Sequence, residues 1–160
     1  MNNPKAAAGL LMFKQVDGIL KVFIVHPGGP TWADRDIGAW SIPKGEIEEV
    51  DGDPFLAAIR EFKEETGFEP NYPYMQLGDI TQKSGKMVSA WAFEGDYDPA
   101  TMKCNEIEVD FPRGSGRMIT IPEVDRGDYF TIEDASVKLN PAQVPFLQRL
   151  TEILYEKSSK

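Results

Sequence analysis

The segment Asp53–Gly67 constrains the fold of this 160-residue chain more than any other part of the sequence. Asp53 is a suitable N-cap for a helix, and Pro54 fits the first helical position. Gly67 comes just after the last helical residue, where a left-handed cap favours glycine. The pattern therefore predicts a helix over Asp53–Thr66.

Two faces of this helix differ in chemistry. At about 100° per residue, three apolar side chains share a narrow arc that we expect to face the core: Phe55, Ile59 and Phe62. Three carboxylates share another face, with Arg60 at its edge: Glu61, Glu64 and Glu65. Like charges at this spacing destabilise a helix by about 0.2–0.5 kcal/mol per pair. The ordinary interpretation is a solvated face of an acidic protein, and the alternative is a site for hard divalent cations.

Composition limits which metal such a site can hold. The chain has one histidine, His26, and one cysteine, Cys104, so a tetrahedral zinc site built from these residue types is nearly excluded. A metal held by oxygen is expected instead, and Mg²⁺ often shares its oxygen ligands with substrate phosphates. The single cysteine excludes a disulfide within the chain, which favours the reducing cytoplasm.

The charge balance excludes two classes of partner. Asp and Glu total 26 against 17 for Lys and Arg, which gives a formal net charge of −9. General nucleic-acid binders and electrostatic membrane binders both need a basic face. We therefore expect neither a nucleic-acid polymer nor a membrane as a partner.

The residues before the acidic helix strengthen the metal-site interpretation. Trp40–Ile42 is predicted to be a short strand that ends at Pro43. Gly45 lets a backbone carbonyl approach an ion without hindrance from a side chain. A strand, a glycine turn, a loop and an acidic helix together predict a site for a metal and a phosphate.

The stretch Gly45–Phe68 resembles the Nudix box of the MutT-like pyrophosphohydrolases. That pattern is a glycine, five residues, Glu, seven residues and then R-E-U-x-E-E-x-G-U, where U is apolar, and Arg60–Phe68 matches it at every fixed position. The spacing from Gly45 to Arg60 is one residue longer than the pattern. The first glutamate of the box therefore has no direct counterpart, and three acidic residues are candidates to replace it: Glu48, Asp51 and Asp53.

Looser similarity extends over much of the chain. Four stretches resemble a bacterial branch of predicted nucleotide pyrophosphohydrolases, similar in outline to the diadenosine tetraphosphate hydrolases: 26–30, 39–46, 122–126 and 143–150. The resemblance implies a single Nudix domain over residues 1–160, with an α/β fold, an α/β/α sandwich around a mixed central sheet. The box lies at 45–68, and residues 157–160 are expected to form a disordered tail.

Hydrophobic patterns predict further elements that fit this fold class. The apolar run Ala6–Phe13 is expected to be a buried first strand rather than a signal segment, because a polar turn follows it where a cleavage site should be. The predicted strands are Ala8–Phe13, Leu20–His26, Tyr74–Thr81, Met87–Glu94, Glu106–Phe111 and Arg117–Ile121. Tyr129–Phe130 is expected to lead into a short helix near Ile132–Leu139, and Ala142–Glu156 to form a final amphipathic helix.

The resemblance also implies an activity. The chain is expected to be a Mg²⁺-dependent hydrolase, with Mn²⁺ as an alternative ion, that cleaves a pyrophosphate bond in a nucleoside diphosphate linked to another moiety. Nucleoside polyphosphates such as diadenosine tetraphosphate are the preferred substrates. The alternatives are ADP-ribose, a nucleotide sugar or a damaged nucleoside triphosphate, and, in another class, a nucleotide sensor without turnover. Many members of the family are dimers, which leaves a homodimer open.

Residue roles follow from the resemblance. Glu61, Glu64 and Glu65 would bind one to three ions, with the Gly45 carbonyl as a further ligand, and Arg60 would orient the acidic cluster. One of the carboxylates would take a proton from the attacking water, and the sequence does not choose among them. Members of the family commonly add a carboxylate from a later loop; Glu123 is the first candidate, and Glu106 and Glu108 are the alternatives.

Candidates for substrate contacts are less specific. Lys44 and Lys86 are placed to meet phosphates, although both could be ordinary surface lysines. Aromatic residues that could stack on a base, or be buried in the core, are Trp40, Trp91 and Tyr129. His26 could contact a phosphate or have a structural role. Residues 105–117 contain two glycines and two arginines, and an ordinary surface hairpin is favoured there over a phosphate-binding lid.

Overall fold

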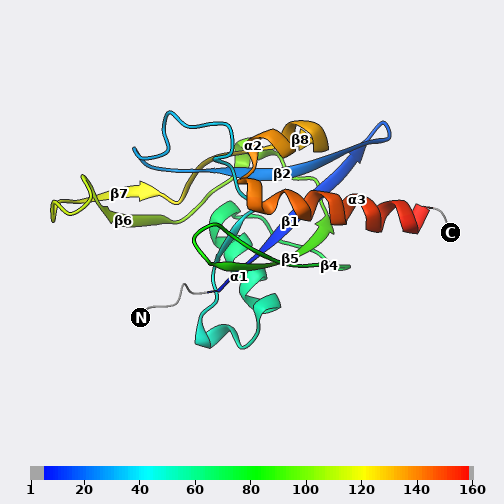
Figure 1. Cartoon of the computed structure of the whole chain (residues 1–160), viewed down its shortest axis with the longest axis horizontal. Coiled ribbons are helices and arrows are strands. Elements are labelled where there is room, and N and C mark those ends of the chain that lie inside the picture. Colours follow the sequence, from blue (N-terminus) through cyan, green and yellow to red (C-terminus); the bar gives the residue numbers. More distant parts are fainter. Residues whose placement is uncertain (1–5, 159–160) are drawn as a thin grey trace.

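The computed structural model of the protein describes residues 6–158, which form a mixed sheet between two helical layers (Figure 1). The strands are β1 (Ala7–Val16), β2 (Ile19–Pro27), β3 (Lys44–Glu46), β4 (Met75–Thr81), β5 (Met87–Glu94), β6 (Glu106–Asp110), β7 (Met118–Pro122) and β8 (Val124–Thr131). The helices are α1 (Pro54–Thr66), α2 (Ile132–Lys138) and α3 (Val144–Ser158). None of the helices among the described residues is both long and apolar enough to cross a membrane.

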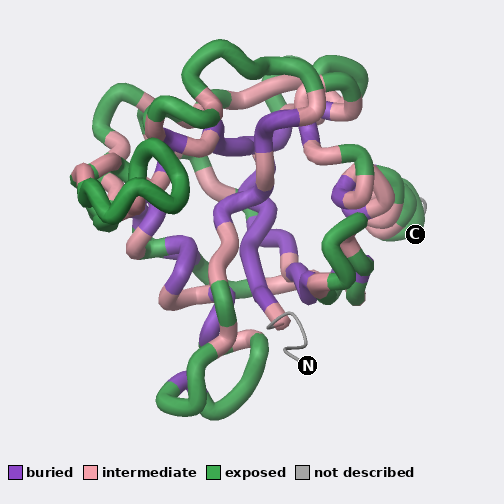
Figure 2. Tube along the Cα trace, turned by 60° about the vertical axis from the view of Figure 1, so that its left-hand side comes forward, coloured by how far each residue is buried: buried purple, intermediate pink, exposed green. Residues whose placement is uncertain are grey.

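Strand β1 lies at the centre of the sheet and is buried on both faces. Leu11 and Phe13 pack on the side of α2 and α3, whereas Leu10 and Met12 pack on the side of α1. Successive side chains of a strand point to opposite faces, so an uninterrupted apolar run suits a strand covered by helices on both sides. Figure 2 shows this buried trace through the middle of the molecule. The expectation of a buried first strand is confirmed.

On one side of β1 the sheet divides, because two different strands pair with the two halves of β1. Its order is β4-β5-β1-β2-β8, with β1 and β5 parallel and the other neighbours in this order antiparallel. The end of β1 pairs with β2 from Phe13 onward, but its start pairs with β3 at Ala7–Gly9. Strands β2 and β3 are therefore adjacent to different halves of β1. This opening brings the chain from β2, β3 and the start of β8 to one end of the sheet.

Helix α1 begins and ends where the sequence predicts. The Asp53 side chain accepts a hydrogen bond from the Leu56 backbone N–H at 2.9 Å, and Gly67 adopts φ 75° at the C-cap. Phe62 is fully buried against Phe93, and Phe55 packs edge-on against Tyr74. The apolar arc faces the sheet as expected.

The prediction of a strand at Trp40–Ile42 is wrong. These residues make only isolated bridges, between Ser41 and Val25 and between Trp40 and Leu139. The Ile42 backbone N–H donates instead to the Gln143 side chain at 2.9 Å, which removes it from any strand ladder. The strand of this region is β3, after Pro43.

Strand β8 is longer than the sequence indicates, because only Tyr129–Phe130 is apolar enough to be recognised. It runs from Val124 to Thr131 and pairs with β2 at the edge of the sheet. Charged side chains along an edge strand protect it from pairing with other chains, and here they hide its hydrophobic pattern.

The chain after β8 differs in smaller ways from the sequence prediction. Helix α2 ends at Lys138, one residue early, and residues 141–143 form a 3₁₀ turn before α3. Helix α3 continues through Ser158, so the expected disordered tail is wrong at 157–158; residues 159–160 lie outside the described part of the chain.

Strands β6 and β7 pair with each other and form a separate two-stranded sheet. Figure 1 shows this hairpin projecting from the body of the molecule. The expectation of a hairpin in this region is confirmed, with strands at 106–110 and 118–122.

Phe62→Ala tests the packing of α1 on the sheet. The ring is fully buried, so its loss should lower the free energy of unfolding by about 3–5 kcal/mol. Leu56→Ala on the same helix is the control, because Leu56 is 50% exposed and its loss should cost no more than about 0.5 kcal/mol. Urea unfolding measures both, and equal losses would contradict this packing.

Candidate functional site

Arg60 is the central cation of the site and binds three separate segments. Its Nε and one Nη donate to the two carboxylate oxygens of Asp51, at 2.6 and 2.9 Å. The other Nη donates to Glu61 at 2.9 Å and to Glu64 at 3.1 Å. The Nη that bonds Asp51 also donates a hydrogen bond to the Glu46 backbone carbonyl at 3.1 Å. The guanidinium therefore ties the loop before α1, strand β3 and the acidic face of α1 together.

Of the three acidic residues that could replace the first glutamate of the box, Asp51 is the one that forms an ion pair with Arg60. It makes the bidentate pair with Arg60, whereas Asp53 caps α1 and Glu48 donates its backbone N–H to Asp51 at 2.8 Å. The hydrogen bonds from Arg60 lower the pKa of Asp51 to about 2. The inserted residue is thus accommodated in the loop without loss of the arginine's partner.

Three carboxylates meet beside this pair. Glu61 and Glu65 come from α1 and Glu123 from the junction of β7 and β8, and each offers an oxygen within 4.8 Å of the other two. Glu61 and Glu65 are each only 8% exposed. Glu64 lies outside this group, half-buried and bound to Arg60. The alternatives Glu106 and Glu108 are exposed on β6 and do not belong to it.

Burial and mutual repulsion shift the acidity of this carboxylate cluster, by which we mean Glu61, Glu65 and Glu123. Burial raises the pKa of Glu61 against the opposing charge of Arg60. Burial raises the pKa of Glu65 well above its usual value, and the charge of Glu123 adds to the rise. The pKa of Glu123 is raised by burial and then by the charge of Glu64. Converging carboxylates of this kind are relieved either by protons or by a cation.

Gly45 makes room for the cluster. A Cβ at this position would lie 2.1 Å from the carboxyl carbon of Glu61, so any side chain would displace that carboxylate. The donor set is made entirely of oxygen, and the backbone of β3 lies directly against it. These features fit a hard divalent cation such as Mg²⁺.

Two lysines lie next to the cluster. The Lys44 backbone N–H donates to Glu65 at 3.3 Å, and burial lowers the pKa of the Lys44 ammonium, against the attraction of Glu65. The nearby charge of Lys86 lowers the pKa of Lys44 further. Lys86 itself lies 3.7 Å from the Glu46 carboxylate. Both predicted phosphate contacts are therefore brought to the same end of the sheet as the cluster.

A pocket of about 290 Å³ opens beside the cluster. Its lining includes Lys44, Glu65 and Glu123 at one end. Aromatic and amide side chains complete the wall: Trp32, Trp40, Gln82, Asn140 and Gln143. We call this the main pocket. It joins a ring-sized space to the carboxylates, which suits a nucleotide with its phosphates directed at the cluster.

The floor of the main pocket is held by Gln143, which is fully buried. Its side-chain oxygen accepts from the Ile42 backbone N–H, and its amide donates to Ser41 Oγ at 3.0 Å and to Gln82 Oε1 at 3.1 Å. Because both its oxygen and its nitrogen are hydrogen-bonded, the Gln143 amide fixes the positions of Ser41, Ile42 and Gln82.

Trp40 and His26 are structural rather than open contact residues. Trp40 lines the main pocket but is 3% exposed, with its indole N–H bound to Asp36 at 2.7 Å and its ring edge-on to His26 and Phe130. His26 is buried, with Nδ1 2.9 Å from Asp125 and Nε2 bound to the Arg35 carbonyl. Because both ring nitrogens of His26 have hydrogen-bond partners, the side chain links the loop that carries Arg35 to the start of β8.

Tyr129 and Trp91 do not line the main pocket. Tyr129 packs against Phe23, and its hydroxyl donates to the Tyr97 carbonyl at 3.1 Å. Burial raises the pKa of Tyr129 to about 12. Trp91 packs on Phe55 of α1. The usual burial of strand aromatics explains both corrections.

Sequence reasoning missed Trp32 and the three pocket amides. Trp32 lies in the loop between β2 and β3, where an aromatic residue flanked by glycines and proline has no core to enter, and this was the signal that could have revealed it. Gln82, Asn140 and Gln143 come from two distant parts of the chain. Their convergence depends on the packing of α3 against β4, which no local pattern encodes.

Comparison with known families gives one match. The model of the NUDIX domain family matches residues 3–150. A comparison with curated protein sequences found no match.

Solved structures share the fold. The chain is similar to the NUDIX domain of Shewanella oneidensis NrtR in a cocrystal with ADP ribose, at 18% identity over 96% of this chain and 90% of that chain, with a TM-score of 0.65. It is similar to a C. elegans Ap4A hydrolase in a binary complex, at 19% identity over 95% and 98%, with a TM-score of 0.65. A Nudix hydrolase from M. smegmatis, RenU, aligns at 17% identity over 98% and 90%, with a TM-score of 0.55.

Asp51→Ala tests the bidentate pair. Removing the carboxylate leaves Arg60 without its main partner and should lower the free energy of unfolding at neutral pH by about 1–3 kcal/mol. Because the pKa of Asp51 is lowered to about 2 in the folded state, this contribution is present above the unfolded value near 4 and is lost as pH falls through about 2. Urea unfolding at a series of pH values measures the difference between variant and wild type. Glu49→Ala, exposed in the same loop, should cost little, and equal losses in the two variants would contradict the assignment.

A pH dependence follows from the raised pKa values of the carboxylate cluster. Ionised Glu61, Glu65 and Glu123 oppose folding in the absence of metal, and this cost is relieved as pH falls through their folded pKa values. A divalent cation would bind the ionised form, so any stabilisation by Mg²⁺ should be larger at about pH 8 than at about pH 5.5. Thermal unfolding with Mg²⁺ and with EDTA measures it.

A matched pair of variants controls the metal experiment. Glu123→Gln should remove most of the Mg²⁺ effect and raise the Tm of the metal-free protein, because it removes one repelling charge. Glu108→Gln, exposed on β6, should change neither quantity. A Mg²⁺ effect that is the same in both variants and at both pH values would refute the cluster as the metal site.

Proposed function

This chain belongs to the Nudix family, and we propose that it is a divalent-metal-dependent pyrophosphohydrolase that cleaves a phosphoric anhydride bond in a nucleoside diphosphate linked to another group. The observation that carries the proposal is the convergence of Glu61, Glu65 and Glu123 at the end of the main pocket. A binding module has no need of three carboxylates forced together at this cost in electrostatic free energy.

Mg²⁺ is the proposed ion, with Mn²⁺ as the alternative, because every donor in the cluster is an oxygen. Glu61, Glu65 and Glu123 would hold it, with the Gly45 carbonyl as a further ligand and Glu64 at the rim. When bound, such an ion polarises the phosphate and lowers the pKa of a water molecule.

The chain's own residues then have separate roles. In the hydrolysis a water oxygen bonds to phosphorus, the bridging P–O bond breaks, and the leaving phosphate keeps the bonding electron pair. The proton of the water passes to one of the carboxylates of the site, which acts as the general base. Arg60 fixes the orientation of Glu61 and Glu64. Lys44 and Lys86 would supply positive charge to the phosphates.

Nucleoside polyphosphates such as diadenosine tetraphosphate are the proposed substrates. The main pocket offers Trp32 for contact with a base and amides for polar recognition. The likeness to an Ap4A hydrolase is in keeping with this choice. The likeness to a domain that holds ADP ribose favours ADP-ribose as the second candidate, with nucleotide sugars and damaged nucleoside triphosphates beside it. A sensor without turnover is the alternative of another class.

The proposed cellular setting follows from charge and cysteine content. A net charge of −9 and one cysteine suit a cytoplasmic enzyme acting on small nucleotides rather than on membranes or nucleic-acid polymers.

Product analysis by anion-exchange chromatography tests the function. The protein is incubated at mildly alkaline pH, with Mg²⁺ or with EDTA, against diadenosine tetraphosphate, ADP-ribose, a nucleotide sugar and the nucleoside triphosphates. We expect ATP and AMP from diadenosine tetraphosphate only when Mg²⁺ is present. If only ADP-ribose or a nucleotide sugar were cleaved, that compound would replace diadenosine tetraphosphate as the proposed substrate. If the protein bound one of these nucleotides but cleaved none of them, a nucleotide sensor without turnover would be favoured.

Glu61→Gln locates the activity in the cluster. The change keeps the shape but removes the charge, and turnover should fall at least about 100-fold with the fold intact. Glu49→Gln, an exposed acid outside the cluster, should keep wild-type turnover. Unchanged activity in Glu61→Gln would reject the assignment of the site.

A further inference from the structure

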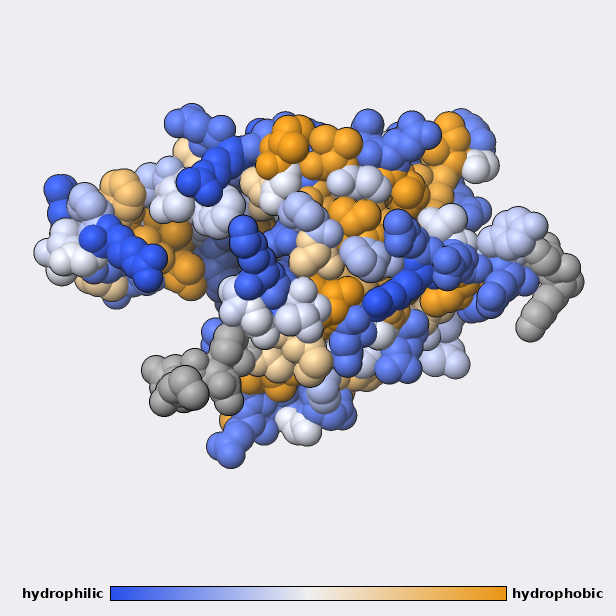
Figure 3. All heavy atoms as spheres, in the orientation of Figure 1, coloured by the Kyte–Doolittle hydropathy of each residue, from blue (hydrophilic) through white to orange (hydrophobic). Residues whose placement is uncertain are grey.

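A second groove adjoins the main pocket. It has a volume of about 410 Å³ and lies between the hairpin β6–β7 and the loop that follows β2. Figure 3 shows a hollow beside the projecting hairpin, with hydrophobic side chains on the hairpin next to it. Three residues line both spaces: Pro27, Trp32 and Glu123. We call this space the hairpin groove; it shares part of its lining with the main pocket, including Glu123 of the carboxylate cluster.

Close contacts join the loop that follows β2 to strand β7 of the hairpin, along one side of the hairpin groove. The Gly28 N–H donates to the Glu123 carbonyl at 3.0 Å. A Cβ on Gly28 would lie 2.1 Å from the Pro122 carbonyl oxygen, and a Cβ on Gly29 would lie 2.6 Å from a methyl carbon of Ile121. Only glycine allows this approach, so the sequence Gly28–Gly29 fixes the loop, and with it Trp32, against β7.

The turn of the hairpin is also fixed. The Asp110 carboxylate accepts from the Gly114 backbone N–H at 2.8 Å and from Ser115 Oγ at 3.2 Å. These hydrogen bonds hold the turn that carries Arg113 at the end of the groove.

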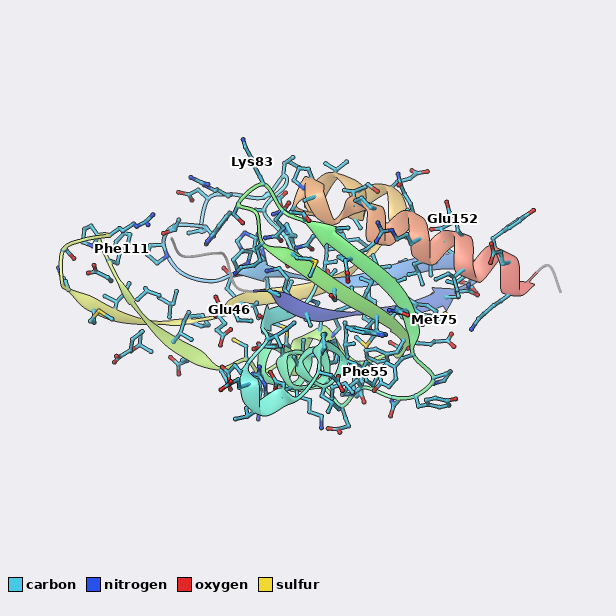
Figure 4. All side chains as sticks on the ribbon, turned by 60° about the horizontal axis from the view of Figure 1, so that its bottom comes forward. Glu46, Phe55, Met75, Lys83, Phe111 and Glu152 are labelled. Carbon is cyan, nitrogen blue, oxygen red and sulfur yellow. The ribbon has the colours of Figure 1, made fainter. Side chains whose placement is uncertain are left out.

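The lining of the hairpin groove is mainly apolar with a cation at its outer end. Ile107 and Phe111 are 41% and 38% exposed, although both are large hydrophobic residues. Figure 4 places Phe111 toward the outer end of the hairpin, well away from Glu46 of β3. Arg113 lines the groove next to Phe111 and forms no ion pair with any residue of 6–158. Two carboxylates, Asp110 and Glu123, also line the groove, and its apolar part fits one face of a flat ring such as a nucleobase.

We propose that the hairpin groove binds the second nucleoside of a dinucleoside polyphosphate, while the main pocket binds the first. The inference rests on the proposed function and narrows its substrate class. Glu123 lies between the two spaces, so a phosphate chain that passes the cluster has a base-sized space at each end. The terminal ribose of ADP-ribose would bury hydroxyl groups against Ile107 and Phe111, which is unfavourable. The groove therefore selects substrates that carry a base at both ends.

Two ligands that differ in the second nucleoside, and therefore also in the charge of the terminal phosphate, test the proposal. Diadenosine tetraphosphate and adenosine 5′-tetraphosphate are titrated by calorimetry with Ca²⁺ in place of Mg²⁺, so that affinity is measured apart from turnover. The wild type should bind diadenosine tetraphosphate about 10-fold more tightly, which is the scale of one stacked base. Phe111→Ala should remove most of this preference and leave the affinity for adenosine 5′-tetraphosphate unchanged.

Matched variants separate the groove from general damage. Met118→Ala changes an exposed apolar residue of the same hairpin that does not line the groove, and the preference should persist. Trp32→Ala should weaken both ligands, because Trp32 lines both spaces. Equal affinity of the two ligands in the wild type, or an equal loss for both in Phe111→Ala, would overturn the proposal.

The remaining outcomes are also decisive. A ligand preference that Phe111→Ala abolishes would support the groove even if Mg²⁺ gave no turnover, and only the proposed function would then fail. Turnover with equal affinity for the two ligands would overturn only the proposal for the hairpin groove. If neither ligand bound, both this proposal and the proposed function would be overturned. A solution dimer that Phe111→Ala dissociates, with no ligand preference, would assign the hairpin to a contact between copies of the chain and overturn the proposal.

Discussion

The bonds of Arg60 are the interaction on which the rest of the site depends. Two buried carboxylates of α1 converge with a half-buried carboxylate from the β7–β8 junction, and their mutual repulsion opposes the packing of α1 on the sheet. Arg60 opposes this by binding Glu61 and Glu64 from one side and Asp51 from the other. Arg60 hydrogen-bonds both carboxylate oxygens of Asp51 and, within the cluster, Glu61, which leaves Glu65 and Glu123 without a hydrogen bond to this cation.

The main pocket forms beside the carboxylate cluster because the sheet is open at this point. Because β1 pairs with β2 along one half and with β3 along the other, the chain between β2 and β3 is free to form the loop that carries Trp32. The same opening admits Gln143 from the 3₁₀ turn before α3, whose side chain accepts the hydrogen bond of the Ile42 backbone N–H in place of a strand partner. Fold and site are therefore coupled: the break in the ladder is what creates space for a ligand beside the carboxylates.

The sequence predicts the acidic helix, its caps and the buried central strand because each depends on local spacing. It also predicts Glu123 as the distant carboxylate through the family resemblance. It leaves Asp51 open, because the extra loop residue allows several registers that only the packed structure distinguishes. It assigns Tyr129 and Trp40 to substrate contacts although both rings are enclosed by other side chains. The pocket amides and the hairpin groove arise from contacts between distant segments, and such contacts have no signature in a single sequence.

The central claim is that Glu61, Glu65 and Glu123 together form a divalent metal site. The most direct measurement is an anomalous difference map from crystals of the protein grown with Mn²⁺. We expect a peak within coordination distance of carboxylate oxygens from both α1 and the β7–β8 junction, next to Gly45. A peak elsewhere, or no peak at this position in a folded protein saturated with Mn²⁺, would contradict the claim.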